Sequence, residues 1–178
     1  SDKSIWFGNN EYLTHLHNDE KIDIKISEIN NPLQYDIWCI QHSLNHKNTL
    51  WIGTQKGLMK LDKATKKAIS YRKTNGLIPF KYFHIQSIIH DKINKKLLWL
   101  CTNKGLILMD ETKGFLKSYN QDNKGDSFLP ATSFQHLYQD DDNVFWLGTA
   151  GEGLIKWQPE TNEHQVLSIT DGFANEVI

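Results

Sequence analysis

Leu50-Trp51-Ile52-Gly53-Thr54 is the motif that decides the fold, because the sequence carries it four times. The other three copies read Ile5-Trp6-Phe7-Gly8-Asn9, Leu98-Trp99-Leu100-Cys101-Thr102 and Phe145-Trp146-Leu147-Gly148-Thr149. From the first tryptophan to the last, the spacings are 45, 48 and 47 residues. A regular period in the forties, carried by strand-forming residues, indicates a repeat architecture.

Each motif lies in a repeat unit of four short predicted strands. In the second unit, a Gly-Leu pair at 57–58 opens the third strand, and the turn Thr74-Asn75-Gly76-Leu77 closes the unit. The pair returns at 105–106 and 153–154, and the turn returns at 170–173. A four-stranded antiparallel sheet cannot bury both of its faces alone, whereas sheets stacked around an axis can. The sequence therefore predicts an all-β protein built as a β-propeller.

The length of the chain predicts a fragment of such a ring, with about 3.5 to 4 blades of four antiparallel strands. The repeat units are expected at approximately residues 1–35, 36–83, 84–131 and 132–174, with residues 175–178 beginning another blade. We expect the remaining blades to belong to the same, longer protein. We also expect the isolated chain to self-associate as a homodimer, with residues 175–178 supplying a missing strand.

The tryptophans and the cysteines lead to two predictions about packing. We expect the flat rings of Trp51, Trp99 and Trp146 to fill the gaps between adjacent sheets. Cys39 and Cys101 fall in different strand types of neighbouring units, where Cα atoms rarely come within bridging distance. We therefore expect two free thiols that pack as small hydrophobic groups.

Composition narrows the range of functions. The net charge is −1 and the isoelectric point is near 6.7, so the segment has no basic field for nucleic-acid binding. No apolar run in the sequence approaches the ~20 residues that span a bilayer, so we expect no membrane contact by this segment. Phosphate-binding loops, nucleophile elbows and zinc motifs are missing from the sequence. We predict no catalytic residue, no cofactor and no metal.

Two polar clusters have a metal-binding interpretation that the sequence does not favour. Asp140-Asp141-Asp142-Asn143 is rich in oxygen ligands, but it lacks the spacing of a calcium loop and occupies a predicted turn, where Asp and Asn are common. His15 and His17 alternate on one face of a strand without a third ligand in the motif. We interpret both clusters as turn and surface residues.

The repeat unit resembles the two-component regulator propeller repeat. The resemblance rests on Asp91 and Asp140 at the ends of first strands, and on the tryptophan motifs, Gly-Leu pairs and Gly turns given above. The signature of WD40 propellers is missing. Three positions depart from the family pattern: Ser43 at an Asp position, and Cys101 and Tyr12 at Gly positions.

Resemblance to this family implies a function in signalling. Such propellers form the periplasmic sensor region of hybrid two-component histidine kinases, and oligosaccharides released from glycans are their usual input. The chain would then be a non-catalytic sensor segment, and the full-length protein would be a histidine kinase anchored in the inner membrane. Two other functions stay open on the residues alone, namely a propeller lyase or hydrolase and a plain protein-interaction scaffold.

The candidate ligand-binding residues lie in the loops that link one unit to the next. The first loop contributes Phe80, Lys81, Tyr82, Phe83 and His84, and the equivalent later loop contributes Asp126 and Phe128. Sugar rings stack on aromatic side chains, and Lys, Asp and His supply hydrogen bonds. The alternative is that the loop aromatics plug the gap between two blades and complete the core.

Overall fold

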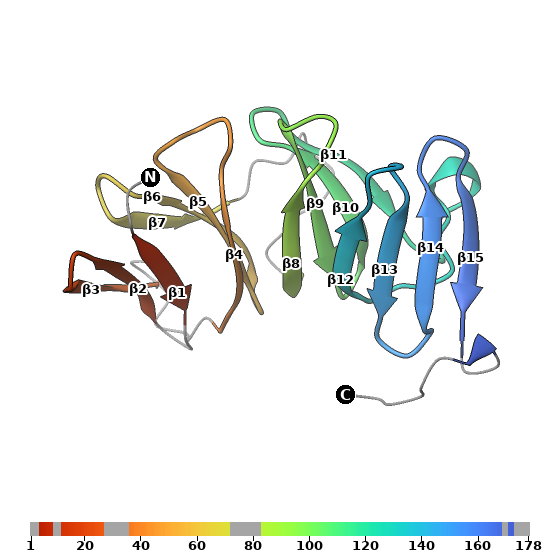
Figure 1. Ribbon diagram of the computed structural model, residues 1–178, viewed down its shortest axis with the longest axis horizontal. Coiled ribbons are helices and arrows are strands. Elements are labelled where there is room, and N and C mark those ends of the chain that lie inside the picture. The colour runs from red at the N-terminus through yellow and green to blue at the C-terminus, as the bar shows by residue number, and fades with distance from the viewer. Residues whose placement is uncertain (1–3, 9–11, 27–35, 72–82, 169–170, 173–178) are drawn as a thin grey trace.

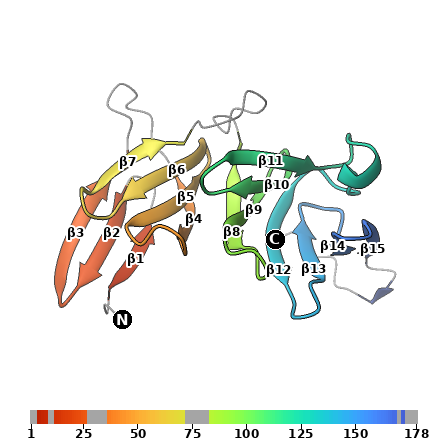
Figure 2. The ribbon, with the colours of Figure 1, turned by 90° about the horizontal axis from the view of Figure 1, so that it is seen from above.

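The computed structural model describes residues 4–8, 12–26, 36–71, 83–168 and 171–172. These residues form four antiparallel sheets, called blades below, which follow one another in chain order across the molecule (Figure 1). The same order is seen from above in Figure 2. The prediction of an all-β propeller fold is confirmed, because each blade is a meander of neighbouring strands and each stacks on the next.

The first blade has three described strands, and the other three blades have four each. The strands of the first blade are β1 (Ile5–Gly8), β2 (Tyr12–His17) and β3 (Glu20–Lys25). Those of the second are β4 (Ile37–His42), β5 (Thr49–Thr54), β6 (Gly57–Asp62) and β7 (Lys67–Ser70). The third consists of β8 (Ile85–His90), β9 (Leu97–Thr102), β10 (Gly105–Asp110) and β11 (Gly114–Tyr119). The fourth consists of β12 (Phe134–Gln139), β13 (Phe145–Thr149), β14 (Leu154–Gln158) and β15 (Glu163–Leu167).

The first strand of a four-stranded blade is called its inner strand below. The inner strands β4, β8 and β12 lie beside one another, and each contains a bulge at the same place. The bulged residues are Trp38, Gln86 and Gln135. A bulge adds one residue to one strand of a pair and turns its side chain away from the regular alternation. These three positions therefore stand apart from the alternating pattern of the blades.

The core consists of three apolar layers, one in each seam between adjacent blades. Trp51 is fully buried in the second seam against Ile88 and Leu100, and Trp99 is 3% exposed in the third seam against Phe145 and Trp157. The expectation that these two tryptophans fill the gaps between sheets is confirmed. Trp146 is only half-buried, because no blade among the described residues covers its face of the fourth sheet.

Close approach of the blades explains why the tryptophan motif carries glycine. A methyl group added at Gly53 would meet the Ile85 backbone oxygen of the next blade at 2.7 Å and would also meet the Cys39 sulfur. Cys101 takes the same position in the third blade and is fully buried beside Leu129 and Ala131. The third seam therefore has room for a side chain that the second seam lacks.

Among the described residues, no helix is long and apolar enough to cross a membrane. The expected strand exchange through residues 175–178 lies outside the described residues and stays a prediction.

Candidate functional site

The two ends of each blade carry different loops and therefore different side chains. At the loop end, the inner strands begin and each blade connects to the next; at the turn end, the inner strands finish. The candidate site lies at the loop end, between the second and third blades. Its members are Trp38 on β4, His84 just before β8, and Asn103 in the turn between β9 and β10.

Trp38 and His84 form an exposed aromatic pair. Their ring centroids are 5.3 Å apart, and the rings are perpendicular, which is a favourable edge-to-face arrangement. Trp38 is 44% exposed although it is a large aromatic residue in an inner strand. The His84 backbone N–H donates to Asn103 Oδ1 at 2.9 Å, which fixes the chain where it enters β8. The pair thus forms an aromatic surface that is exposed to solvent.

One of the ligand-binding residues predicted from the sequence belongs to this candidate site. His84 is where a ligand-binding loop was expected, and it is exposed. Phe83 is half-buried and packs on the core of the second seam, as the plug alternative describes. Phe80, Lys81 and Tyr82 lie outside the described residues. Trp38 was missed, although Gln86 and Gln135 stand at the same position of the other blades, and comparison of the repeats singles it out.

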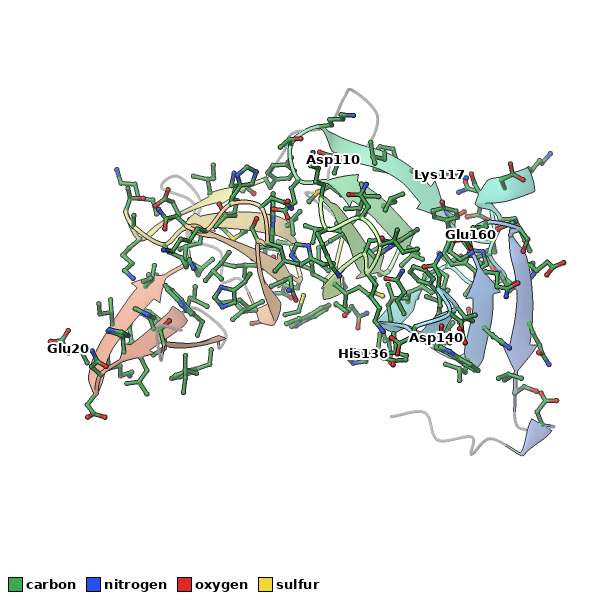
Figure 3. The ribbon with its side chains drawn as sticks, turned by 45° about the horizontal axis from the view of Figure 1, so that its top comes forward. Glu20, Asp110, Lys117, His136, Asp140 and Glu160 are labelled. Atoms are coloured by element: carbon green, nitrogen blue, oxygen red, sulfur yellow. The ribbon has the colours of Figure 1, made fainter. Side chains whose placement is uncertain are left out.

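Asp126 and Phe128 have neighbours in a different part of the molecule. They lie on the connection after β11, which includes a short 3₁₀ turn, η2 (Gly125–Ser127). The Asp126 backbone oxygen accepts a hydrogen bond from Lys117 Nζ at 2.9 Å, and Lys117 is labelled in Figure 3. The Phe128 ring lies 5.6 Å from the ring of His164 on β15. The first contact holds the connection to β11 of the third blade, and the second holds it to β15 of the fourth blade.

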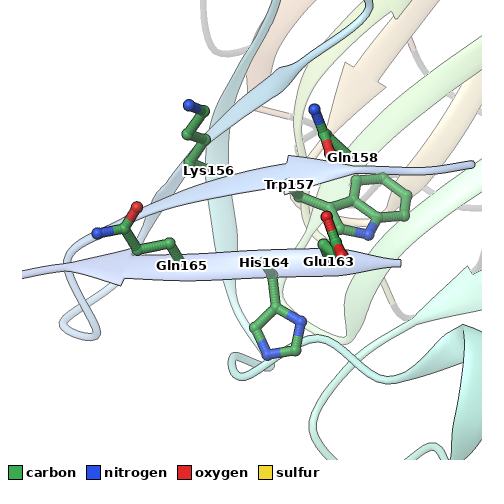
Figure 4. Close-up of a pocket in the computed structure, with 6 residues that line it drawn as sticks. All are labelled: Lys156, Trp157, Gln158, Glu163, His164 and Gln165. Atoms are coloured by element: carbon green, nitrogen blue, oxygen red, sulfur yellow. The ribbon is translucent and has the colours of Figure 1, made fainter. Parts of the chain in front are cut away.

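A cavity of about 210 Å³ lies against β14 and β15 (Figure 4). Its lining is mostly polar and comes from Lys156, Trp157, Gln158, Glu163, His164 and Gln165. Trp157 is fully buried, and its Nε1 donates to Asn162 Oδ1 at 3.0 Å. Lys156 lies over Trp146 as Lys60 lies over Trp51, a tryptophan that the next blade covers. The parallel with Trp51 indicates that this side of the fourth blade is a surface on which another blade packs. We interpret the cavity as part of that surface and not as a ligand site.

At the turn end, aspartate side chains accept hydrogen bonds that stabilise the turns. Asp140 Oδ1 accepts from the backbone N–H groups of Asp142 and Val144, and Asp140 Oδ2 accepts from Trp146 Nε1 at 3.0 Å. The Trp146 hydrogen bond is the main cause that lowers the pKa of Asp140, which Figure 3 labels. The interpretation of 140–143 as a turn agrees with these bonds. No group of three or more metal-binding side chains occurs among the residues that the structure describes.

Both cysteines are free thiols. Burial raises the pKa of Cys39 to about 12, and burial raises the pKa of Cys101 as well. Cys39 Sγ lies 3.7 Å from the Ile85 backbone oxygen, across the second seam. Cys101 is buried and Cys39 is half-buried, and protonated thiols of this kind are poor nucleophiles, so neither sulfur is a candidate for covalent chemistry.

Comparison with known families gives a match to part of the fourth blade and the connection before it. Residues 129–151, which include Asp140 and the Trp146 motif, match the family model described as two component regulator propeller. This stretch is therefore similar to a two-component regulator propeller repeat. The second and third blades share its four-stranded plan, and the third blade also has its Asp and Trp pair. No curated protein matches the chain significantly in sequence.

Solved structures with the same fold include extracellular domains of putative two component systems and a WD40 propeller. The chain resembles the extracellular domain of the putative hybrid two component system BT3049 from B. thetaiotaomicron, with a TM-score of 0.75 and 20% identity over 94% of this chain and 24% of that one. It resembles the corresponding domain of BT4673 from B. thetaiotaomicron, with a TM-score of 0.72, 21% identity and the same coverage. The WD40 propeller of Doa1 matches with a TM-score of 0.62 and 12% identity, over 94% of this chain and 51% of that one. The chain spans about a quarter of the length of the first two, and these likenesses establish the propeller fold.

Proposed function

We propose that this chain is a non-catalytic, extracytoplasmic sensor segment of a hybrid two-component receptor, and that it binds glycan-derived oligosaccharides at the Trp38–His84 pair. The family match and the likeness to extracellular domains of putative hybrid two component systems support the sensor assignment. On this proposal the segment lies in the periplasm, and a membrane anchor and a histidine kinase belong to other parts of the full-length protein.

Trp38 is the observation that carries the ligand proposal. An exposed tryptophan on a rigid inner strand presents a flat apolar face at no cost in ordering a loop. The CH-rich face of a sugar ring stacks on such a surface. The ring nitrogens of His84 and the half-buried amides of Gln86 and Gln135, on neighbouring inner strands, are suited to hydrogen-bond sugar hydroxyls. This combination of a flat aromatic and several neutral polar groups favours an uncharged carbohydrate.

The test is calorimetric titration of the chain with a panel of neutral and acidic oligosaccharides, repeated with the Trp38→Ala variant. Loss of one stacking contact costs about 0.5–1.5 kcal/mol, which is up to roughly tenfold in Kd. The matched control is Tyr138→Ala, because Tyr138 is also an exposed aromatic of an inner strand, 60% exposed, but near the turn end. We expect Trp38→Ala to weaken binding and Tyr138→Ala to leave it unchanged.

Two results would contradict the proposal. Binding that is equally strong in both variants would place the ligand elsewhere on the molecule. Conversion of an oligosaccharide to a new product during the titration, detected by mass spectrometry, would favour the lyase or hydrolase alternative.

A further inference from the structure

His90 is the last residue of the inner strand β8, and its ring lies in the second seam, between the second and third blades. His90 Nε2 lies 2.7 Å from the backbone oxygen of His42, the last residue of the inner strand of the second blade. His90 Nδ1 lies 3.1 Å from the backbone oxygen of Lys95, in the hairpin that follows β8. The ring therefore connects the backbones of two blades at the turn end.

Both partners of the His90 ring are hydrogen-bond acceptors. A carbonyl oxygen has no proton to donate, so each ring nitrogen must carry the proton of its own hydrogen bond. Neutral imidazole has a proton on one nitrogen only, whereas imidazolium has one on each. The two contacts therefore fit the charged form of His90. In the neutral form, one nitrogen would turn its lone pair towards a carbonyl oxygen.

A carboxylate stands beside the ring in the same seam. Glu111 Oε1 lies 3.7 Å from His90 Nδ1, and only 6% of the His90 side chain and 1% of the Glu111 side chain are exposed. Glu111 already joins the two blades, because its Oε2 accepts from Trp51 Nε1 and Ser43 Oγ of the second blade. A buried charge needs a partner of opposite sign, and Glu111 supplies one for an imidazolium at this place.

The other carboxylates near the end of β8 have partners of their own. Asp91 Oδ2 accepts from Trp99 Nε1 at 2.9 Å, and Asp110 Oδ1 accepts from backbone N–H groups of the turn that follows it. Among the described residues, Glu111 is therefore the one carboxylate within ion-pair distance of His90. The basic side chains of the surrounding strand ends and turns are all exposed to water, which screens their charge, namely those of His42, His46, Lys47, Lys92, Lys95, Lys96 and Lys113.

The fourth blade has a residue without a titratable group in the same place. Gln139 ends β12 as His90 ends β8, and its Oε1 accepts from the Lys92 backbone N–H of the preceding blade at 2.7 Å. Gln139 Nε2 lies 3.5 Å from Asp91 Oδ2, as His90 Nδ1 lies beside Glu111. Both side chains connect a blade to the one before it, but an amide does not change its charge with pH.

We propose that His90 is a pH-sensitive lock on the second seam: with both ring protons in place it holds the second blade to the third at the turn end, and loss of one proton loosens the seam. Acidification completes the two hydrogen bonds of the ring. A rise in pH removes one of them and leaves the Glu111 carboxylate without its cation. The same two blades carry the Trp38–His84 pair at the loop end, but the lock does not depend on a ligand there.

The test is hydrogen exchange of two indole N–H groups between about pH 5 and about pH 8, the range in which histidine ordinarily changes its charge. The Trp51 indole reports on the second seam, because its acceptor Glu111 belongs to the third blade. The Trp99 indole is buried in the third seam, where Gln139 takes the place of His90. Rates are compared as protection factors, so that the intrinsic effect of pH on exchange is divided out.

We expect the protection factor of the Trp51 indole to fall about tenfold from the acidic to the alkaline end of this range, as for the loss of one hydrogen bond from a charged donor. The Trp99 indole should keep its protection. His90→Gln copies the residue of the fourth blade and should remove the pH dependence at Trp51. The matched control is His136→Gln, at an exposed position of β12, which should leave the pH dependence in place.

The ring nitrogens of His90 give a readout in the unmodified chain. In a spectrum of isotope-labelled protein, both nitrogens should carry a proton at the acidic end of the range, and one should lose its proton towards the alkaline end. A single ring proton throughout the range would contradict the lock, because the charged form would then never be present.

Three results of the exchange experiment would also overturn the proposal. A Trp51 protection factor that does not change with pH would show that no lock operates in this seam. A pH dependence that survives His90→Gln would assign the effect to another group, such as His42. Equal changes at Trp51 and Trp99 would indicate a general loosening of the chain. A dispersed amide spectrum of each variant establishes that it is folded.

Discussion

Replacing Glu111 with alanine removes the carboxylate that joins the second and third blades. Glu111 is 4% exposed, and its side chain accepts from Trp51 Nε1, Ser43 Oγ and Asn45 Nδ2, while His90 Nδ1 lies 3.7 Å away. The substitution leaves the fully buried Trp51 indole and the buried Ser43 hydroxyl without this acceptor. Each unsatisfied buried donor costs about 1–3 kcal/mol. We therefore expect Glu111→Ala to lower the free energy of unfolding by about 3 kcal/mol.

The structure also prescribes the rescue. Asp91 and Asp140 show that an aspartate after the inner strand can accept from the tryptophan of its own blade. Ser43→Asp should therefore recover about 1–2 kcal/mol in the Glu111→Ala background. In the unmodified chain, Ser43→Asp should destabilise, because it sets a second carboxylate beside that of Glu111.

The assay is a double-mutant cycle measured by denaturant unfolding, with tryptophan fluorescence as the probe. In a thermal scan, Glu111→Ala should lower Tm by roughly 6–12 °C for a chain of this size. Additive effects of Ser43→Asp and Glu111→Ala would refute the reasoning, because additivity means that the two positions do not share an acceptor role.

Three further predictions follow from packing, charge and burial. Gly53→Ala should destabilise by about 1–3 kcal/mol through overpacking, whereas Gly148→Ala, whose added methyl has its nearest neighbour at 3.8 Å, should stay within about 0.5 kcal/mol in chemical denaturation. The hydrogen bonds that lower the pKa of Asp140 stabilise the fold at pH values above the ordinary pKa of an aspartate, and this contribution is lost as pH falls through the lowered value. Trp146→Phe should raise the Asp140 pKa towards normal in an NMR titration. An unchanged pKa would contradict the hydrogen bond. Thiol titration under native conditions should find Cys101 unreactive, while denaturing, non-reducing conditions should release two reactive thiols, and finding none would indicate an oxidised pair.

The fold could be predicted because the repeat supplies the same local pattern several times. The Trp51 and Trp99 motifs are short continuous apolar runs, as expected of strands buried on both faces, and the strands that carry them are buried almost throughout. Both the repeat period and the burial are therefore visible in the sequence. The half-burial of Trp146 was not predictable from its own motif, because its exposure depends on whether a blade covers its face. Tertiary contact, and not the local pattern, determines that difference.

Polar contacts across seams could not be predicted from one sequence. Glu111 lies in a turn, where an acidic residue has no local signal, and its partner Trp51 is 60 positions away. The substitution of Ser43 for aspartate was visible, but only the structure shows that another blade compensates for it. The position of Trp38 could not be predicted either, because a bulge removes this residue from the in-and-out alternation that sequence patterns detect. Its value as a candidate ligand surface comes from its exposure, which the pattern does not report.

The most direct test of the sensor proposal is the dose response of the intact receptor to an oligosaccharide that binds the chain. Receptors carrying Trp38→Ala and Tyr138→Ala are compared with the unmodified receptor by kinase autophosphorylation. Our account predicts that Trp38→Ala shifts the half-maximal concentration upwards by up to roughly tenfold with an unchanged maximum, and that Tyr138→Ala leaves the curve in place. Coinciding curves for all three receptors would contradict the assignment of the Trp38–His84 pair as the ligand surface.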